Sequence, residues 1–502
     1  MPFIQFIKQL LTNVNDVFAG GFQQKLTLIR NFLSDQQENA IIRLFVPAVS
    51  GVGHQATSVN MLYRLISLGF QQTVQVIYDD SDDNTGNKLK RLIPGFNPAT
   101  NAPVVINNAT LTFYTLEFFE TNPNNFPELG FGFTGGYDND SVNLADKVNV
   151  TFFLKLQPFE WSKQNAVQRK SSLRNTWPVL EQQQALGNIT YRKRGYFLPA
   201  PQLTHQDLID LNSTFPGKQQ PYQDVLAVTT GHNANVNLLP VYGIGDNADF
   251  PGFVEADPSI RPESVLLNLI CAVADRQQTS NVQRLRRSAI ILVAATISPG
   301  PYQNLASFLS GNADNMAALN GYINGNQIPQ RVSVLAYTAP TLQQAINALP
   351  NANNHILVIN MGGLTIATFN YLYSCSTLPC VFEGKGTANL VMNLNMPYLN
   401  VIKSTTTYPT LPLHAQQSPM SVLATRRAKC MNTAAGLLNT ALAGQAVVNS
   451  VTEVSQQIED SYDNTTQMYQ YFAGLSAFFH NEEEDKLILG LLFFLGYVNT
   501  QN

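Results

Sequence analysis

The chain has 502 residues, of which 44% are hydrophobic and only 13% charged, and its formal net charge is −4. This length exceeds one ordinary hydrophobic core and predicts two main domains with helical extensions. The slightly acidic balance gives no broad basic surface, so nucleic acid is not an expected partner.

The first 40 residues are expected to be helical, because apolar residues recur at helix spacing in 3–14 and again in 26–32. No basic segment followed by an apolar core and a cleavage site opens the chain, which favours a helix over a signal peptide. The expected localisation is therefore cytoplasmic, or delivery to another cell without a classical signal peptide.

From residue 41 the pattern changes to alternating strands and helices. A strand at Ile41–Val46 meets the glycine-rich turn Ser50-Gly51-Val52-Gly53-His54, which opens a helix ending near Gly69, and a second strand follows at Thr73–Tyr78. A strand–helix–strand unit of this length forces parallel pairing with a right-handed crossover. His54 then lies beyond the carboxyl end of a strand, where open α/β sheets bind ligands. It is a candidate general base; a helix cap or hydrogen-bonded loop residue is an equal alternative.

The rest of this domain, assigned to residues 41–255, carries further expected strands at 111–116, 148–156 and Asp224–Thr230. The segment Asn122–Asp140 is rich in Asn, Pro and Gly and is expected to be a long loop. The cluster Asp79-Asp80-Ser81-Asp82-Asp83 has oxygen ligands for a divalent cation but no EF-hand pattern, so a solvated loop is favoured and no metal is expected.

A second α/β series is assigned to residues 256–415. It begins with a helix through Ser264–Ala274 and continues with the apolar run Ala289–Ala295, which is typical of a strand buried on both faces. Further strands are expected at 331–337, 355–360, 380–382 and 398–401. The turn after the strand at Ala289–Ala295 holds Ser298 and Gly300, which could form one wall of a nucleotide site. An ordinary proline-rich loop is the alternative.

The most informative turn of the second series is Glu383-Gly384-Lys385-Gly386-Thr387-Ala388-Asn389, between the strand at 380–382 and a helix. Gly384 and Gly386 would let a diphosphate approach the backbone, and N–H groups from Gly386 to Asn389 would cradle it. Lys385 would add a positive charge, and Glu383 would accept hydrogen bonds from ribose hydroxyls. A glycine turn that merely opens a helix is the alternative, because Gly-x-Gly alone is common.

Residues 416–502 are expected to form helices, and no transmembrane segment is predicted. The apolar run Leu487–Val498 is too short to cross a bilayer and is expected to be a buried terminal helix. The acidic residues Glu482–Asp485 before it suit a helix N-terminus. The four cysteines, few for this length and without zinc-site spacing, are expected to be buried free thiols in a reducing compartment: Cys271, Cys375, Cys380 and Cys430.

Two α/β series, each with a glycine turn after a strand, resemble the two Rossmann-like domains of GT-B glycosyltransferases. Val46–Phe70 is similar to the glycine-rich first loop of that class, and Leu378–Val401, with Pro397 before its last strand, to the donor-binding strand–turn–helix–strand. The resemblance implies an α/β fold with two domains facing across a cleft, the acceptor bound by the first and a nucleotide sugar by the second. Many members carry an acidic residue inside the following helix, where this chain has Asn389 and Leu390.

The resemblance also implies the reaction: metal-independent transfer of a sugar from a UDP- or GDP-linked donor to an acceptor that is a protein, a glycan or a small molecule. No cofactor is expected beyond the nucleotide sugar as co-substrate. His54 is the expected catalytic base. The expected binding residues are Gly51, Gly53, Ser298, Gly300, Glu383, Lys385, Gly386, Thr387 and Asn389.

Two other classes remain open. A dinucleotide-binding oxidoreductase using NAD(P) would place Gly51-x-Gly53 on the pyrophosphate; Asp79 or Asp80 suits the ribose contact, but the third glycine position holds Ala56. A non-catalytic interaction protein would use the Rossmann-like cores only as a scaffold.

Overall fold

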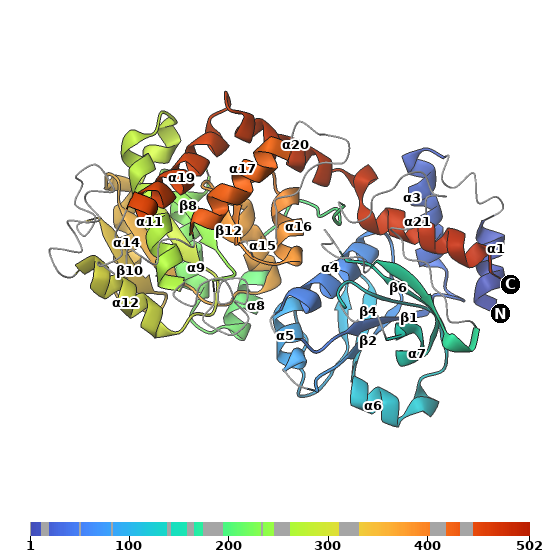
Figure 1. Ribbon diagram of the computed structural model, residues 1–502. Coiled ribbons are helices and arrows are strands. Elements are labelled where there is room, and N and C mark those ends of the chain that lie inside the picture. The colour runs from blue at the N-terminus through green and yellow to red at the C-terminus, as the bar shows by residue number, and fades with distance from the viewer. Residues whose placement is uncertain are drawn as a thin grey trace. The chain divides into compact units, whose positions relative to one another are not determined.

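The computed structural model describes residues 2–11, 20–49, 52–81, 84–137, 142–157, 165–173, 194–231, 234–244, 262–310, 331–401, 418–431 and 445–501 (Figure 1). The chain forms two compact units. The first unit comprises Met1–Pro199 together with Phe478–Asn502, and the second comprises Ala200–Ala477. Each unit is built on one sheet, so the mixed α/β class expected from the sequence is confirmed.

The sheet of the first unit has the strand order β3-β4-β2-β1-β5-β6-β7. Its five inner strands are parallel, and the two edge strands, β3 and β7, are antiparallel to their neighbours. The strands are β1 (Ile41–Val46), β2 (Thr73–Tyr78), β3 (Val104–Ile106), β4 (Ala109–Thr115), β5 (Leu129–Thr134), β6 (Val150–Lys155) and β7 (Ala166–Arg169).

The expected long loop at Asn122–Asp140 was wrong, because β5 lies inside it and pairs with both β1 and β6. Its sequence alternates glycine with phenylalanine, and glycine is depleted in strands. Space explains the glycines: a Cβ on Gly130 would lie 2.1 Å from the Phe3 ring, and one on Gly132 would lie 2.9 Å from the Phe153 ring. Close packing therefore overrides β propensity in this strand.

Helices cover both faces of this sheet. On one face α1 (Pro2–Leu10), α3 (Phe22–Ser34) and α21 (Lys486–Asn499) pack together. The Phe494 ring lies 4.8 Å from that of Phe131, and the Phe32 ring 5.6 Å from it. The opposite face carries α6 (Leu116–Thr121) and α7 (Leu144–Lys147), whose apolar residues join Phe45 and Phe153 in a core. The run Leu487–Val498 is thus a buried helix, as expected.

The start of α21 is held by α4 (Gly53–Ser67). The Arg64 guanidinium donates to Asp485 Oδ2 and to Glu482 Oε1, at 2.7 Å in each case. Asp485 is only 1% exposed. Its second carboxylate oxygen, Oδ1, accepts hydrogen bonds from the backbone N–H groups of Leu487 and Phe197. One carboxylate therefore caps α21 and joins it to α4 and to the segment that leaves the first unit.

The sheet of the second unit is parallel throughout, in the order β10-β11-β9-β8-β12-β13. Its strands are β8 (Asn237–Val241), β9 (Ala289–Val293), β10 (Val332–Ala336), β11 (Ile356–Asn360), β12 (Cys380–Phe382) and β13 (Tyr398–Asn400). One core joins this sheet to α8 (His205–Thr214), α9 (Gln219–Thr229), α14 (Leu342–Ala348) and α15 (Ile366–Ser374). The other α-helices among the described residues of this unit are α11 (Pro262–Thr279), α12 (Pro299–Ser310), α16 (Lys385–Asn393), α17 (Ser418–Lys429), α19 (Gln445–Tyr462) and α20 (Gln467–Phe479).

One expectation for the middle of the chain was wrong, and one strand there was missed. The segment Asp224–Thr230 lies largely in α9, where Tyr222, Val225, Leu226 and Thr229 form a buried stripe at helix spacing. The strand β8 was missed because it is short and contains Pro240, a residue that argues against a central strand. β8 pairs with β9 and β12, and the compact unit that contains it comprises Ala200–Ala477.

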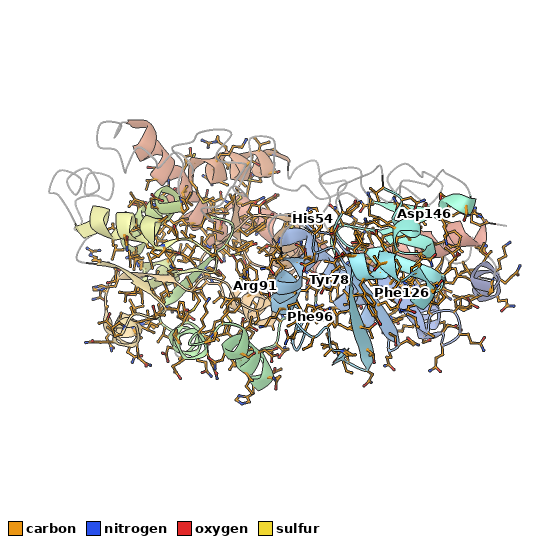
Figure 2. The ribbon with its side chains drawn as sticks, turned by 90° about the horizontal axis from the view of Figure 1, so that it is seen from below. His54, Tyr78, Arg91, Phe96, Phe126 and Asp146 are labelled. Carbon is orange, nitrogen blue, oxygen red and sulfur yellow. The ribbon has the colours of Figure 1, made fainter. Side chains whose placement is uncertain are left out.

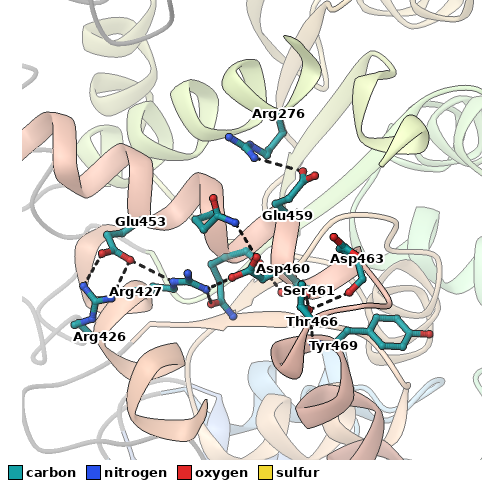
Figure 3. Close-up of polar contacts among 12 residues, drawn as sticks. Arg276, Arg426, Arg427, Glu453, Glu459, Asp460, Ser461, Asp463, Thr466 and Tyr469 are labelled. Carbon is teal, nitrogen blue, oxygen red and sulfur yellow. Dashed lines mark hydrogen bonds and ion pairs between the residues drawn. The ribbon is translucent and has the colours of Figure 1, made fainter. Parts of the chain in front are cut away.

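Charged side chains join the C-terminal helices of the second unit (Figure 3). Arg427 of α17, whose side chain is 9% exposed, donates to Asp460 of α19 at 2.7 Å and to Glu453 at 3.2 Å. The neighbouring Arg426 also reaches Glu453, but its side chain is 57% exposed. Ion pairs of exposed side chains contribute little, whereas hydrogen bonds to buried charges contribute more.

We therefore expect Arg427→Ala to lower the free energy of unfolding of the second unit by about 2 kcal/mol. Arg426→Ala, one residue away, is the matched control and should cost less than about 0.5 kcal/mol. Urea denaturation of the two variants measures the difference. Equal losses would contradict the unequal burial that the structure gives these side chains.

Candidate functional site

In the first unit the strands β1 and β5 are neighbours whose connections leave in opposite directions, to β2 and to β6. Such a topological switch point opens a crevice at the carboxyl ends of the strands. The helix α4 begins there at Gly53, and His54 is its second residue, half-buried (Figure 2). Gly51 lies outside the described residues. His54 is thus at the edge of the sheet formed by the carboxyl ends of the parallel strands, the edge at which open α/β sheets bind ligands in general.

The segment after β5 forms the other side of this switch point. A Cβ on Gly135 would lie 2.4 Å from the carbonyl oxygen of Thr57, and one on Gly136 would lie 2.9 Å from that of His54. Only glycine allows the two backbones to approach so closely. Sequence reasoning missed this pair, although Thr-Gly-Gly directly after an alternating phenylalanine run was the available signal.

Polar groups at the strand ends fix these segments. Thr134, the last residue of β5, donates from Oγ1 to the Phe45 carbonyl at 2.8 Å and lies 3.1 Å from the Ser58 hydroxyl. The first turn of α4 is tied to the end of β1 by Gln55, whose Nε2 donates to the Pro47 carbonyl at 3.0 Å. The backbone beside His54 is therefore held from both strands, which is the rigidity that a catalytic side chain needs.

Asp79 and Tyr137 follow β2 and β5 at the same edge of the sheet. The Tyr137 ring packs edge-on against Phe45 at 5.7 Å, and burial together with the charge of Asp79 raises the pKa of its phenol. Asp80 accepts a hydrogen bond from the Gly86 N–H at the start of α5 (Thr85–Leu92). Figure 2 labels Tyr78, the last residue of β2, whose ring meets Phe96 at 6.1 Å.

The acidic cluster is only partly described, because Asp82 and Asp83 lie outside the described residues. Within the described ranges no group of three or more His, Cys, Asp or Glu side chains is placed to hold a metal ion. The position of Asp79 after β2 also suits the NAD(P) alternative, while Ala56 is an ordinary residue of α4 whose N–H bonds to the Val52 carbonyl.

In the second unit the corresponding switch point lies between β8 and β12, whose connections leave toward β9 and β13. The predicted donor-binding turn follows β12 there. Gly384 precedes α16 with a φ of +92° and has nothing within 4 Å of its Cβ position. Glu383 and Thr387 are half-buried, and Asn389 is fully buried.

The start of α16 therefore places a helix N-terminus and a glycine with an unobstructed Cβ position at this switch point, an arrangement that suits a diphosphate. Gly386 is buried in the first turn of this helix. The side chain of Lys385 lies outside the described residues, so its predicted contact with phosphate stays a prediction.

A glycine that sequence reasoning missed lies opposite this turn. Gly243, two residues after β8, has a φ of +84°, and a Cβ on it would lie 2.3 Å from the Cβ of Glu383. The hydrogen bonds between β8 and β12 continue up to this point, because the Tyr242 N–H donates to the Val381 carbonyl at 2.9 Å. The segments after β8 and β12 are thus in direct contact.

Two other turns also follow strands of this sheet, and the one after β9 was expected from the sequence. Ser298 is exposed and Gly300 half-buried, both after β9, the neighbour of β8. The segment 360–364 follows β11, where Lys218 donates from Nζ to the Gly363 carbonyl at 2.6 Å and lies over the Phe215 ring at 4.5 Å. The turns after β9, β11 and β12 therefore lie at one edge of the sheet, where its parallel strands end.

The four cysteines are free thiols, as expected. Cys271 and Cys380 are buried, and Cys375 and Cys430 are half-buried. Burial raises the pKa of all four, that of Cys271 to about 12. A raised pKa disfavours the thiolate and makes these side chains poor nucleophiles.

Comparison with protein-family models and with curated proteins finds no match for this chain. In the part of the chain that the structure describes, no helix combines the length and the hydropathy needed to cross a membrane; α21 has 14 residues.

Proposed function

We propose that the protein is a glycosyltransferase that moves a sugar from a nucleotide-sugar donor to an acceptor without a metal ion. The observation that carries this proposal is the position of Glu383–Asn389 at the β8/β12 switch point, with an open Gly384 and the N-terminus of α16 beside it. The presence of a second Rossmann-like sheet, with His54 at its own switch point, supports the same reading.

Each group has a defined role in the proposed reaction. The donor diphosphate rests on the N–H groups at the start of α16, which stabilise the negative charge that develops as the bond between sugar C1 and phosphate oxygen breaks. The acceptor hydroxyl forms the new bond to C1 and gives its proton to His54, if the reaction inverts the anomeric centre. Glu383 accepts hydrogen bonds from the ribose.

The GT-B resemblance belongs to this proposal as well. It assigns the acceptor to the first unit and the nucleotide sugar to the second, with the two domains facing across a cleft during the reaction. The polypeptide leaves the first unit near Pro199 and returns to it at Phe478.

A ligand panel tests the proposal against its alternatives. UDP-, GDP- and CDP-sugars and NAD(P) are added separately, and the melting temperature is measured together with hydrogen exchange of peptides covering 383–393 and 53–67. A ligand at 100 times its Kd stabilises the folded state by about 2.7 kcal/mol. We expect one class of nucleotide sugar to raise the melting temperature and to protect 383–393.

The other results of the panel have equally definite meanings. NAD(P) that stabilises the protein and protects 53–67 would replace the proposal with an oxidoreductase. No stabilisation by any ligand, at concentrations up to several millimolar, would favour the non-catalytic interaction protein. Inorganic phosphate at the same concentration serves as the control for unspecific binding of anions.

A further inference from the structure

The segments after β8 and β12 lie so close together that no side chain fits at Gly243. A Cβ on Gly243 would lie 2.3 Å from the Cβ of Glu383, 2.7 Å from its backbone nitrogen and 3.0 Å from its Cα. Two of these three atoms belong to the backbone, so a rotamer change of the Glu383 side chain cannot make room. A side chain at position 243 would have to move the Glu383 backbone.

The strands below this contact leave little freedom to absorb such a movement. On one side of Gly243 the Tyr242 N–H bonds to the Val381 carbonyl at 2.9 Å. On the far side of β12, the Val401 N–H after β13 donates to the Phe382 carbonyl at 2.7 Å. The Tyr373 hydroxyl also donates to the Val381 carbonyl. Both chains are therefore fixed up to the residue before the contact, and displacement would fall on Glu383 and Gly384.

We infer that Gly243 is a positioning residue of the nucleotide site: because it has no side chain, it sets where Glu383 and the start of α16 lie. This inference rests on the proposed function, since it assumes that a nucleoside diphosphate binds at Glu383–Asn389. It also assigns the segment Tyr242–Ile244, which the sequence did not suggest, to the wall of that site.

The chain offers a matched control that separates close contact from backbone strain. Gly231 has the same φ as Gly243, +84°, and lies in the same unit, but nothing lies within 4 Å of its Cβ position. Alanine at either position adopts the disfavoured left-handed conformation. Only alanine at position 243 meets Glu383.

The experiment measures the affinity of wild type, Gly243→Ala and Gly231→Ala for UDP and for GDP by calorimetric titration, at a temperature where all three are folded. We expect Gly243→Ala to weaken the binding of the preferred diphosphate at least tenfold and Gly231→Ala to leave it within twofold. Wild-type affinity in Gly243→Ala, or equal weakening in both variants, would overturn the inference. If wild type binds neither diphosphate, the proposed function itself fails.

A second measurement keeps the inference testable if Gly243→Ala does not fold. In wild type, the added diphosphate should slow hydrogen exchange in a peptide that spans 242–244 together with one that spans 383–389. The segment 360–364, two strands away after β11, serves as the internal control. Protection of 383–389 alone would show that the β8 segment is no part of the site and would overturn the inference.

Discussion

Replacement of His54 by alanine is expected to lower the turnover of sugar transfer by at least about 100-fold, the range in which a general base contributes. The affinity for the nucleotide sugar should stay within about twofold, because the donor turn at Glu383–Asn389 belongs to the other unit. His54 lies in the first turn of α4 at the β1/β5 switch point, and its backbone is held against Gly136. Steady-state kinetics and calorimetric titration measure the two quantities.

Two controls accompany this variant. His54→Gln keeps a polar side chain that cannot take up a proton, so it should be as inactive as alanine. His205→Ala changes an exposed histidine at the start of α8 and should leave turnover unchanged. Turnover of His54→Ala close to that of wild type would exclude the base assignment, and a parallel loss of donor affinity would indicate a role in folding.

Arg43→Met is expected to lower the free energy of unfolding of the first unit by about 3–5 kcal/mol. Arg43 is fully buried in β1, and its guanidinium carbon lies 5.1 Å from the centroid of the Phe119 ring and 5.9 Å from that of Phe126. Its guanidinium donates to the Val148, Asn149 and Pro127 carbonyls at 2.9, 2.7 and 2.8 Å, and to Gln75 Oε1.

Burial lowers the pKa of Arg43 to about 10, and in the described part of the chain this guanidinium has carbonyl and amide partners but no ion pair. Methionine fills a similar volume but leaves the Val148 and Pro127 carbonyls without a donor, and the Asn149 carbonyl keeps only the Leu129 N–H. An unsatisfied buried polar group costs about 1–3 kcal/mol. From the sequence, Arg43 is only a single charged residue in an otherwise apolar strand, and its carbonyl partners could not be predicted.

Calorimetry together with hydrogen exchange of β1, β5 and β6 peptides measures the effect of Arg43→Met. We expect a melting temperature lower by roughly 10 °C for a unit of this size. Lys90→Met, at an exposed position of α5 in the same unit, should change the free energy of unfolding by less than about 0.5 kcal/mol. A small effect of Arg43→Met would mean that water replaces the guanidinium at these carbonyls.

Elements with strong local patterns could be predicted from the sequence. The strands β1, β2 and β9 have near-continuous runs of β-branched and aromatic residues, and the turn–helix unit after β1 follows directly. Two of the missed elements, β5 and β8, have local sequences that contradict their structure. Glycine weakens β5 and proline weakens β8, and both strands exist because neighbouring strands on each side supply their hydrogen bonds and buried surface.

The residues of the candidate site also fall into those that the sequence could predict and those that it could not. His54 and Glu383 could be placed because each follows a strand in the chain, and parallel strands bring their carboxyl ends to one edge. Gly136 and Gly243 could not, because the atoms that require glycine belong to residues 82 and 140 positions away in the chain. Only a three-dimensional contact shows that these positions admit no side chain.

The anchoring of α21 has a practical consequence for experiments on separate parts of the protein. Since Phe494 packs on Phe131 and Asp485 binds Arg64, a fragment that stops at Pro199 would lose a layer of its core and leave a guanidinium without its buried carboxylate. An expression fragment of the first unit has to carry the last 25 residues as well, joined through a short linker that replaces the second unit.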